Sequence, residues 1–179
     1  MTALTRGPTA KDVILILLAK CHSNAMNGIT RIEKLSFILA LSPDFRDLRE
    51  KLAFRPLHYG PYSDLIAESI EILHENDYID AEPLNFELQI SNRADEVSME
   101  EMCDTKEFIE TRNFHLTAKG KIIADHRYGE LSLGQRREID RIAKQYGQLD
   151  LKELIRRVYS LAPEDMLRLS RIREEMMCN

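Results

Sequence analysis

The fold is decided by residues 61–81, PYSDLIAESIEILHENDYIDA, which predict a helix that leads into a strand. Pro61 suits the first turn of a helix, because the amide hydrogen that proline lacks has no partner there. Apolar or small side chains recur at three- and four-residue spacing, which predicts the buried face of a helix over 61–76. That face holds Leu65, Ile66, Ser69, Ile70 and Leu73. Residues 78–81 then alternate between apolar and polar, as strands do.

Two more helices are predicted earlier in the chain. Thr9 and Asp12 form a capping-box pattern ahead of the apolar run 13–19. A run that is apolar on all sides predicts a central helix covered by its neighbours. The same pattern, with Thr30 as the cap, opens a second helix over 30–41.

The other segments before residue 117 are short. Residues 45–52 predict a helical turn, and two prolines and a glycine in 54–62 predict an ordered loop or extended stretch. Residues 86–90 alternate like those of 78–81, and 108–116 can return as a partner strand. The polar, acidic residues 91–106 between them predict a loop or insertion.

The remaining chain is predicted to be helical. Thr117 opens a helix, and apolar spacing predicts others over 136–146, 151–161 and 163–177. The last of these carries a stripe of Met166, Leu169, Ile172 and Met176. This stripe has two interpretations, packing on the core or a seam between two copies in a homodimer, and packing is favoured.

The order helix, helix, helix, strand, strand is typical of a winged helix-turn-helix core with a small β wing. We therefore expect a mainly α (α+β) protein with this core over residues 1–128. A C-terminal helical subdomain over 129–179 would pack on the core as an extension. The length of 179 residues, with 44% hydrophobic and 31% charged residues, suits a folded chain of this size.

Three segments resemble a known family. They are the run Arg31–Leu39 (RIEKLSFIL), the loop Phe54–Ser63 (FRPLHYGPYS) and Leu116–Gly120 (LTAKG). Together they resemble the YwgA-like prokaryotic proteins and, more distantly, the Panacea domain of SocA-like antitoxins, over about residues 10–126. The resemblance implies a winged-helix-like core, a prokaryotic or phage origin and often no assigned enzyme activity. Panacea-type proteins are associated with neutralising toxins. The acidic insertion and the basic tail depart from the Panacea pattern.

The net charge of −5 is unevenly distributed. Residues 1–59 and 134–173 each carry a net +4, whereas residues 60–113 carry −12. The third predicted helix holds no Lys or Arg, and its acidic residues would be repelled by a phosphate backbone. DNA recognition through this helix is therefore not expected, and an acidic face favours a basic partner surface.

The aromatic cluster beside Gly60 and Pro61 has two interpretations. Its tyrosine rings fill space between the second and third helices, which is favoured, or they contact a ligand or partner. With the acidic helix it defines the candidate protein-partner surface, which consists of His58, Tyr59, Tyr62, Asp64, Glu68, Glu71 and Glu75.

The basic tail suggests a second surface. Arg137, Arg141 and Lys144 share one helical face at four- and three-residue spacing. A solvated face, or one paired with acidic residues, is favoured over contact with nucleic acid.

Nothing in the pattern predicts catalysis. The five histidines are scattered, the three cysteines form no Cys-x-x-Cys pair, and no phosphate-binding glycine loop is present. We expect no enzyme activity, no cofactor and no metal. The longest apolar run has seven residues, so no membrane span is expected, and the N-terminus resembles no signal peptide, which predicts the cytoplasm.

The sequence therefore predicts a non-enzymatic winged-helix interaction module that binds another protein as a regulatory or antitoxin-like factor. The alternative is a DNA-binding transcriptional regulator that uses the basic C-terminal helices and the wing.

Overall fold

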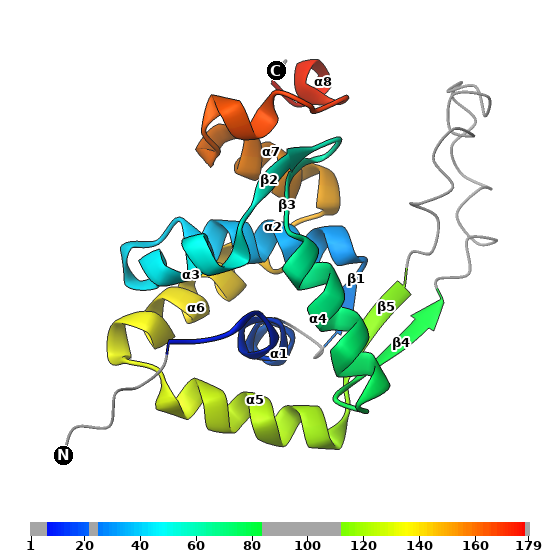
Figure 1. Ribbon diagram of the computed structural model, residues 1–179, viewed down its shortest axis with the longest axis vertical. Coiled ribbons are helices and arrows are strands. Elements are labelled where there is room, and N and C mark those ends of the chain that lie inside the picture. Colours follow the sequence, from blue (N-terminus) through cyan, green and yellow to red (C-terminus); the bar gives the residue numbers. More distant parts are fainter. Residues whose placement is uncertain (1–6, 22–24, 84–111, 178–179) are drawn as a thin grey trace.

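The protein is mainly helical with small antiparallel sheets, and the computed structural model describes residues 7–21, 25–83 and 112–177 (Figure 1). The helices are α1 (Ala10–Lys20), α2 (Ile29–Ala40), α3 (Arg46–Leu52), α4 (Asp64–Glu75), α5 (Ala118–Glu130), α6 (Leu133–Tyr146), α7 (Leu151–Leu161) and α8 (Arg173–Met177). The 3₁₀ helices are η2 (Pro43–Phe45) and η5 (Glu164–Leu167). The strands are β1 (Ala25–Asn27), β2 (Arg55–Leu57), β3 (Gly60–Tyr62), β4 (Ile79–Pro83) and β5 (Arg112–Leu116). The predicted strand 86–90 and insertion 91–106 lie outside the described residues.

Helix α1 lies at the centre of the molecule, where Figure 1 shows it nearly end-on among α2, α4, α5 and α6. Its predicted capping box is confirmed: the Thr9 hydroxyl accepts from the Asp12 amide, and the Asp12 carboxylate accepts from the Thr9 amide. Side chains from Val13 to Leu18 are all at most 2% exposed, which confirms the central position. Each such burial stabilises the fold by roughly 1.5–3 kcal/mol.

Helix α2 is buried along most of its length, but its predicted cap is wrong. The helix begins at Ile29, directly after Gly28, and no side chain caps it. The Gly28 amide donates to the carbonyl of Arg112 at 2.9 Å, so the chain leaves the sheet and enters the helix without an intervening loop. Gly28 makes this turn with φ of 80°, a conformation that favours glycine. Thr30 therefore lies inside the first turn, where a capping residue cannot act.

Strands β1, β5 and β4 form one antiparallel sheet in that order. The buried Phe114 of β5 lies opposite Met26 on one side and Ala81 on the other. The predicted strand 78–81 and the C-terminal part of its return partner are confirmed as β4 and β5. The pattern does not predict β1, because three residues are too few to show an alternation.

The junction between β3 and α4 differs from the prediction. Residues 54–62 form the hairpin of β2 and β3, in which Pro61 lies opposite Pro56. The prediction that a helix begins at Pro61 is therefore wrong. Helix α4 begins at Asp64, because the Ser63 hydroxyl accepts from the Ile66 amide at 3.3 Å and caps it.

Helix α7 confirms the prediction over 151–161, and α6 ends at Tyr146 as predicted but begins at Leu133, where Ser132 caps it, instead of at residue 136. The single helix predicted over 163–177 is wrong. The chain forms η5, an irregular segment and then α8. The irregular segment bonds the hairpin: the Arg171 amide and the Ser170 hydroxyl both donate to the carbonyl of His58. Leu167 is buried in place of the predicted Leu169, which is 53% exposed.

The expected boundary after residue 128 lies inside α5, which ends at Glu130. One apolar cluster includes side chains from both sides of it, such as Leu35 of α2 and Val158 of α7. Helix α2 packs against both α6 and α7, so the C-terminal helices and the N-terminal helices share a core.

Candidate functional site

The β2–β3 hairpin is held against the C-terminal segment. Gly60 has φ of 90°, and a Cβ at this position would lie 3.0 Å from the ring of Tyr159. The His58 carbonyl accepts the two hydrogen bonds from residues 170 and 171. The hairpin therefore packs against α7 and η5, and Figure 1 shows β2 and β3 beside α7.

Two adjacent charged residues of α2 lie buried beneath this hairpin. Glu33 is 3% exposed and Lys34 is 1% exposed. Lys34 Nζ donates to the carbonyl of Pro61 at 2.8 Å and lies 4.0 Å from the Glu33 carboxylate. The amide of Ser63 also bonds Glu33, whereas Glu33 Oε1 has no partner within the described structure. The pair thus holds the short segment that ends the hairpin and starts α4.

Burial shifts the pKa of both groups toward their neutral forms. Desolvation raises the pKa of Glu33 to about 8, against the lowering effect of Lys34. Desolvation lowers the pKa of Lys34 to about 8, against the raising effect of Glu33. Perturbed pairs of this kind occur in catalytic sites. Here the adjacent cavity, lined by Thr30, Tyr59 and Tyr62 among others, measures about 10 Å³ and holds no more than one water molecule.

Helix α4 presents the acidic face that the sequence predicts, but two of its carboxylates are neutralised within the chain. Asp64 accepts two hydrogen bonds from Arg55, each at 2.9 Å. Glu71 accepts two from Arg112 of β5. These guanidinium groups hold the pKa of both carboxyls below their usual range. Asp64 and Glu71 therefore tie α4 to its neighbours and offer little uncompensated charge.

The other two carboxylates of the predicted surface have no counter-charge among the described residues. Glu68 and Glu75 are exposed, and neither has an ion pair or hydrogen bond from its side chain to any described residue. Leu65 and Ile72 accompany them on the outer face, each 40% exposed. The predicted burial of Leu65 is wrong, because the buried face of α4 is centred on Ile66 and Ile70, and position 65 lies outside that face.

The seven residues of the predicted partner surface come from two elements: His58, Tyr59 and Tyr62 belong to the β2–β3 hairpin, and the four acidic residues belong to α4. The hairpin and α4 leave their junction in opposite directions in Figure 1, the hairpin toward α7 and the helix toward β4. His58 and Tyr59 lie half-buried in the hairpin. Tyr62 lies next to the start of α4. The Arg55 guanidinium lies 5.0 Å from the centre of the Tyr62 ring, and the same guanidinium donates to Asp64. Of the predicted surface, α4 alone carries exposed carboxylates without a described ion pair.

The three predicted nucleic-acid residues all lie exposed on α6. Arg141 forms a bidentate ion pair with Glu138, which compensates its charge. Arg137 and Lys144 form no ion pair with any described residue. The basic face is therefore reduced to two uncompensated charges.

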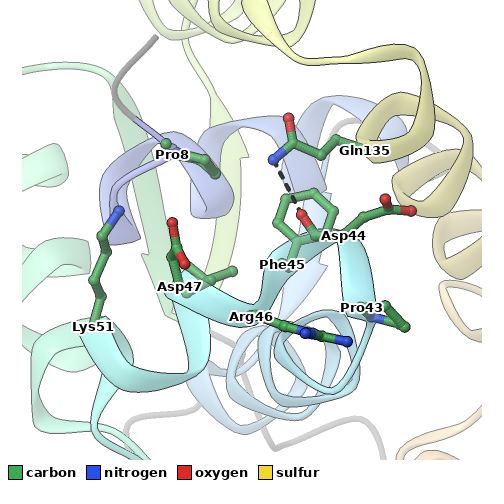
Figure 2. A pocket seen from close by; sticks show the side chains of 10 residues that line it. Pro8, Pro43, Asp44, Phe45, Arg46, Asp47, Lys51 and Gln135 are labelled. Atoms are coloured by element: carbon green, nitrogen blue, oxygen red, sulfur yellow. Dashed lines mark hydrogen bonds between the residues drawn. The ribbon is translucent and has the colours of Figure 1, made fainter. Parts of the chain in front are cut away.

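A cavity of about 230 Å³ was not predicted. Gly7 and Pro8, the stretch 43–48, Lys51 and Gln135 line it. Figure 2 shows Gln135 of α6 reaching the backbone of Asp44, a bond of 3.2 Å. The volume lies below the roughly 300–1,000 Å³ that is usual for ligand pockets. The residues that line this cavity are far apart in the chain, so no sequence pattern predicted the cavity.

Within the described ranges, no helix has the length and apolar character needed to cross a bilayer. No group of three or more His, Cys, Asp or Glu side chains in those ranges is placed to hold a metal ion.

Comparisons with family models, curated proteins and solved structures found no match to the chain. The α4 face is therefore the candidate site on the strength of its own geometry and charge.

Proposed function

We propose that this chain is a non-enzymatic, cytoplasmic protein-interaction module of a regulatory or antitoxin-like kind. The outer face of α4 binds a basic surface of another protein. One observation carries the proposal: Glu68 and Glu75 are exposed without an internal counter-charge, beside two exposed apolar side chains. Complementary charge would steer a basic partner to this face and repel acidic ones.

We also propose a winged-helix core, with α1, α2 and α4 as its helices and β4 and β5 as the base of its wing. The element order and the packing of α1 against both α2 and α4 support this assignment. Helix α3 and the hairpin are then an insertion before the third helix. In DNA-binding members of this architecture the corresponding helix enters the major groove. The acidic face of α4 would be repelled there, which favours a protein partner.

The test reverses the two uncompensated charges. The wild-type chain should capture partner proteins from an extract of its source cells. The variant Glu68→Lys with Glu75→Lys should no longer capture them, as measured by quantitative affinity capture. Glu71 is left in place, because reversing it would break the bond to Arg112 inside the molecule. Arg137→Glu with Lys144→Glu, on α6, is the matched control and should retain the same proteins. Equal retention by the α4 variant would contradict the proposal.

The second candidate function is DNA binding through α6 and the wing. Arg137 and Lys144 support it, since both are exposed without a described counter-charge. The wing tip lies outside the described residues. Fluorescence anisotropy with labelled duplex DNA at about 50 and 200 mM salt tests it, since phosphate contacts weaken steeply over that range. Binding that is salt-sensitive and lost with Arg137→Glu and Lys144→Glu would favour this function, and no binding at low salt would remove it.

A further inference from the structure

The outer face of α4 carries two parallel rows of side chains. Leu65 and Ile72 are seven residues apart, and so are Glu68 and Glu75. Seven residues make nearly two helical turns, so each pair lies along the helix axis and the two rows lie side by side. Both apolar side chains are 40% exposed, and both carboxylates are exposed. The face therefore has an apolar row with an acidic row next to it.

We infer that this face binds one amphipathic helix of another protein, which carries apolar side chains with Lys or Arg beside them at seven-residue spacing. The inference rests on the proposed function and adds the class of partner. Two helices that cross at a shallow angle meet through rows that repeat every seven residues. Charged residues beside such an apolar row select partners of opposite charge. Leu65 and Ile72 supply the apolar contact, and Glu68 and Glu75 the charge.

The internal ion pairs define where the partner's charges must lie. Arg55 and Arg112 already neutralise Asp64 and Glu71 on the far edge of the face. The uncompensated charge is thus confined to Glu68 and Glu75, about 10 Å apart along the axis at 1.5 Å per residue. A partner helix matches this separation with two cations seven residues apart.

Charge also decides against a second copy of this chain as the occupant. Antiparallel pairing of α4 with α4 across a two-fold axis would bring the acidic rows together, and like charges at a packed interface are unfavourable. Parallel pairing would leave each acidic row without a counter-charge on the other α4, since the helix holds no Lys or Arg. The contact is small, since one helix of twelve residues forms it. Interfaces of this size are transient, and a dissociation constant on the order of micromolar is expected.

A phage-displayed library of single-helix peptides, selected against the full-length chain, tests the inference. Enriched peptides should carry apolar residues seven apart with Lys or Arg beside them, and should gain helicity by circular dichroism when they bind. Their affinity should fall at least about tenfold for Leu65→Ser with Ile72→Ser, and for Glu68→Lys with Glu75→Lys. All four positions are exposed, and thermal melting checks that both variants fold.

The other outcomes separate the two proposals. Binding that is lost with the charge reversal but unchanged by the serine variant, or that brings no helicity, would overturn the helical partner and leave the acidic interaction face standing. Binding unchanged by both variants would overturn both. Failure to enrich any helical peptide would overturn the helical partner alone, since the affinity capture with the charge-reversed variant tests the face independently.

Discussion

At the scale of the residue, Glu33 and Lys34 form a pair of buried ionisable groups. Removing one member of such a pair leaves an uncompensated buried charge, whereas replacing both with residues of similar volume is often tolerated. The pair bonds backbone groups of Pro61 and Ser63, so its role is to hold the hairpin and the start of α4 in register with α2.

The pair predicts a minimum in the free energy of unfolding near pH 8. Burial raises the pKa of Glu33 from 4.5 to about 8, so between these values the native state keeps a proton that the unfolded chain releases, and stability falls as pH rises. Burial lowers the pKa of Lys34 from 10.5 to about 8, so above pH 8 the unfolded chain binds the extra proton and stability rises with pH. Each slope is at most about 1.4 kcal/mol per pH unit.

Urea denaturation between about pH 5 and 10 measures this minimum. The double variant Glu33→Gln with Lys34→Met should lack it, because neither side chain then titrates. A wild-type profile that matches the double variant would show that the pair does not titrate in this range.

At the scale of the element, α5 is positioned by one close backbone contact. Thr117 caps the helix and its hydroxyl donates to the carbonyls of Asp77 and Tyr78. A Cβ at Gly120 would lie 1.9 Å from the Tyr78 oxygen, so only glycine lets the helix approach this turn. Gly129, near the other end of α5, has no atom within 4 Å of such a Cβ.

We therefore expect opposite effects from the same substitution in one helix. Gly120→Ala should lower the free energy of unfolding by about 1–3 kcal/mol, because the backbone must move apart. Gly129→Ala should raise it by up to about 1 kcal/mol, because alanine has the higher helix propensity. Chemical denaturation of both variants checks this, and similar values for the two would contradict the close packing of α5.

At the scale of the whole molecule, the C-terminal segment and the hairpin depend on each other. The segment gives up helical hydrogen bonds to bond His58, and it places Leu167 in the core. The predicted stripe of Met166, Leu169, Ile172 and Met176 is broken for the same reason, since residues 166–176 do not form one helix. Ile172 and Met176 still pack against the core, which was the favoured interpretation of the stripe.

A chain that ends at Ala162 should be less stable by at least about 2 kcal/mol, from the lost burial of Leu167 and the lost bonds to His58. Hydrogen exchange of the amides in β2 and β3 should accelerate more than that of α1. Leu169→Ser in the full chain is the control and should change stability by less than about 0.5 kcal/mol, because Leu169 is largely exposed. Unchanged exchange in the hairpin would show that α7 alone supports it.

The sequence by itself determined the features that depend on neighbours within a few residues. The sequence predicts the capping box at Thr9, the central position of α1, the start of α5 after Thr117 and the bounds of α7, which follow from local hydrogen bonds and helical periodicity. The acidic face of α4 was also predictable, because its composition needs no knowledge of the rest of the chain.

Only the tertiary structure decided the features that depend on distant residues. The helical spacing of α2 does not predict that Glu33 and Lys34 are buried. They are buried because the hairpin covers them. Which carboxylates of α4 stay uncompensated depends on Arg112, 41 residues from Glu71. The break in the last predicted helix depends on a carbonyl at residue 58. In each case a group's burial or hydrogen-bond partner is set by a neighbour in space, and a periodic pattern records only neighbours in the chain.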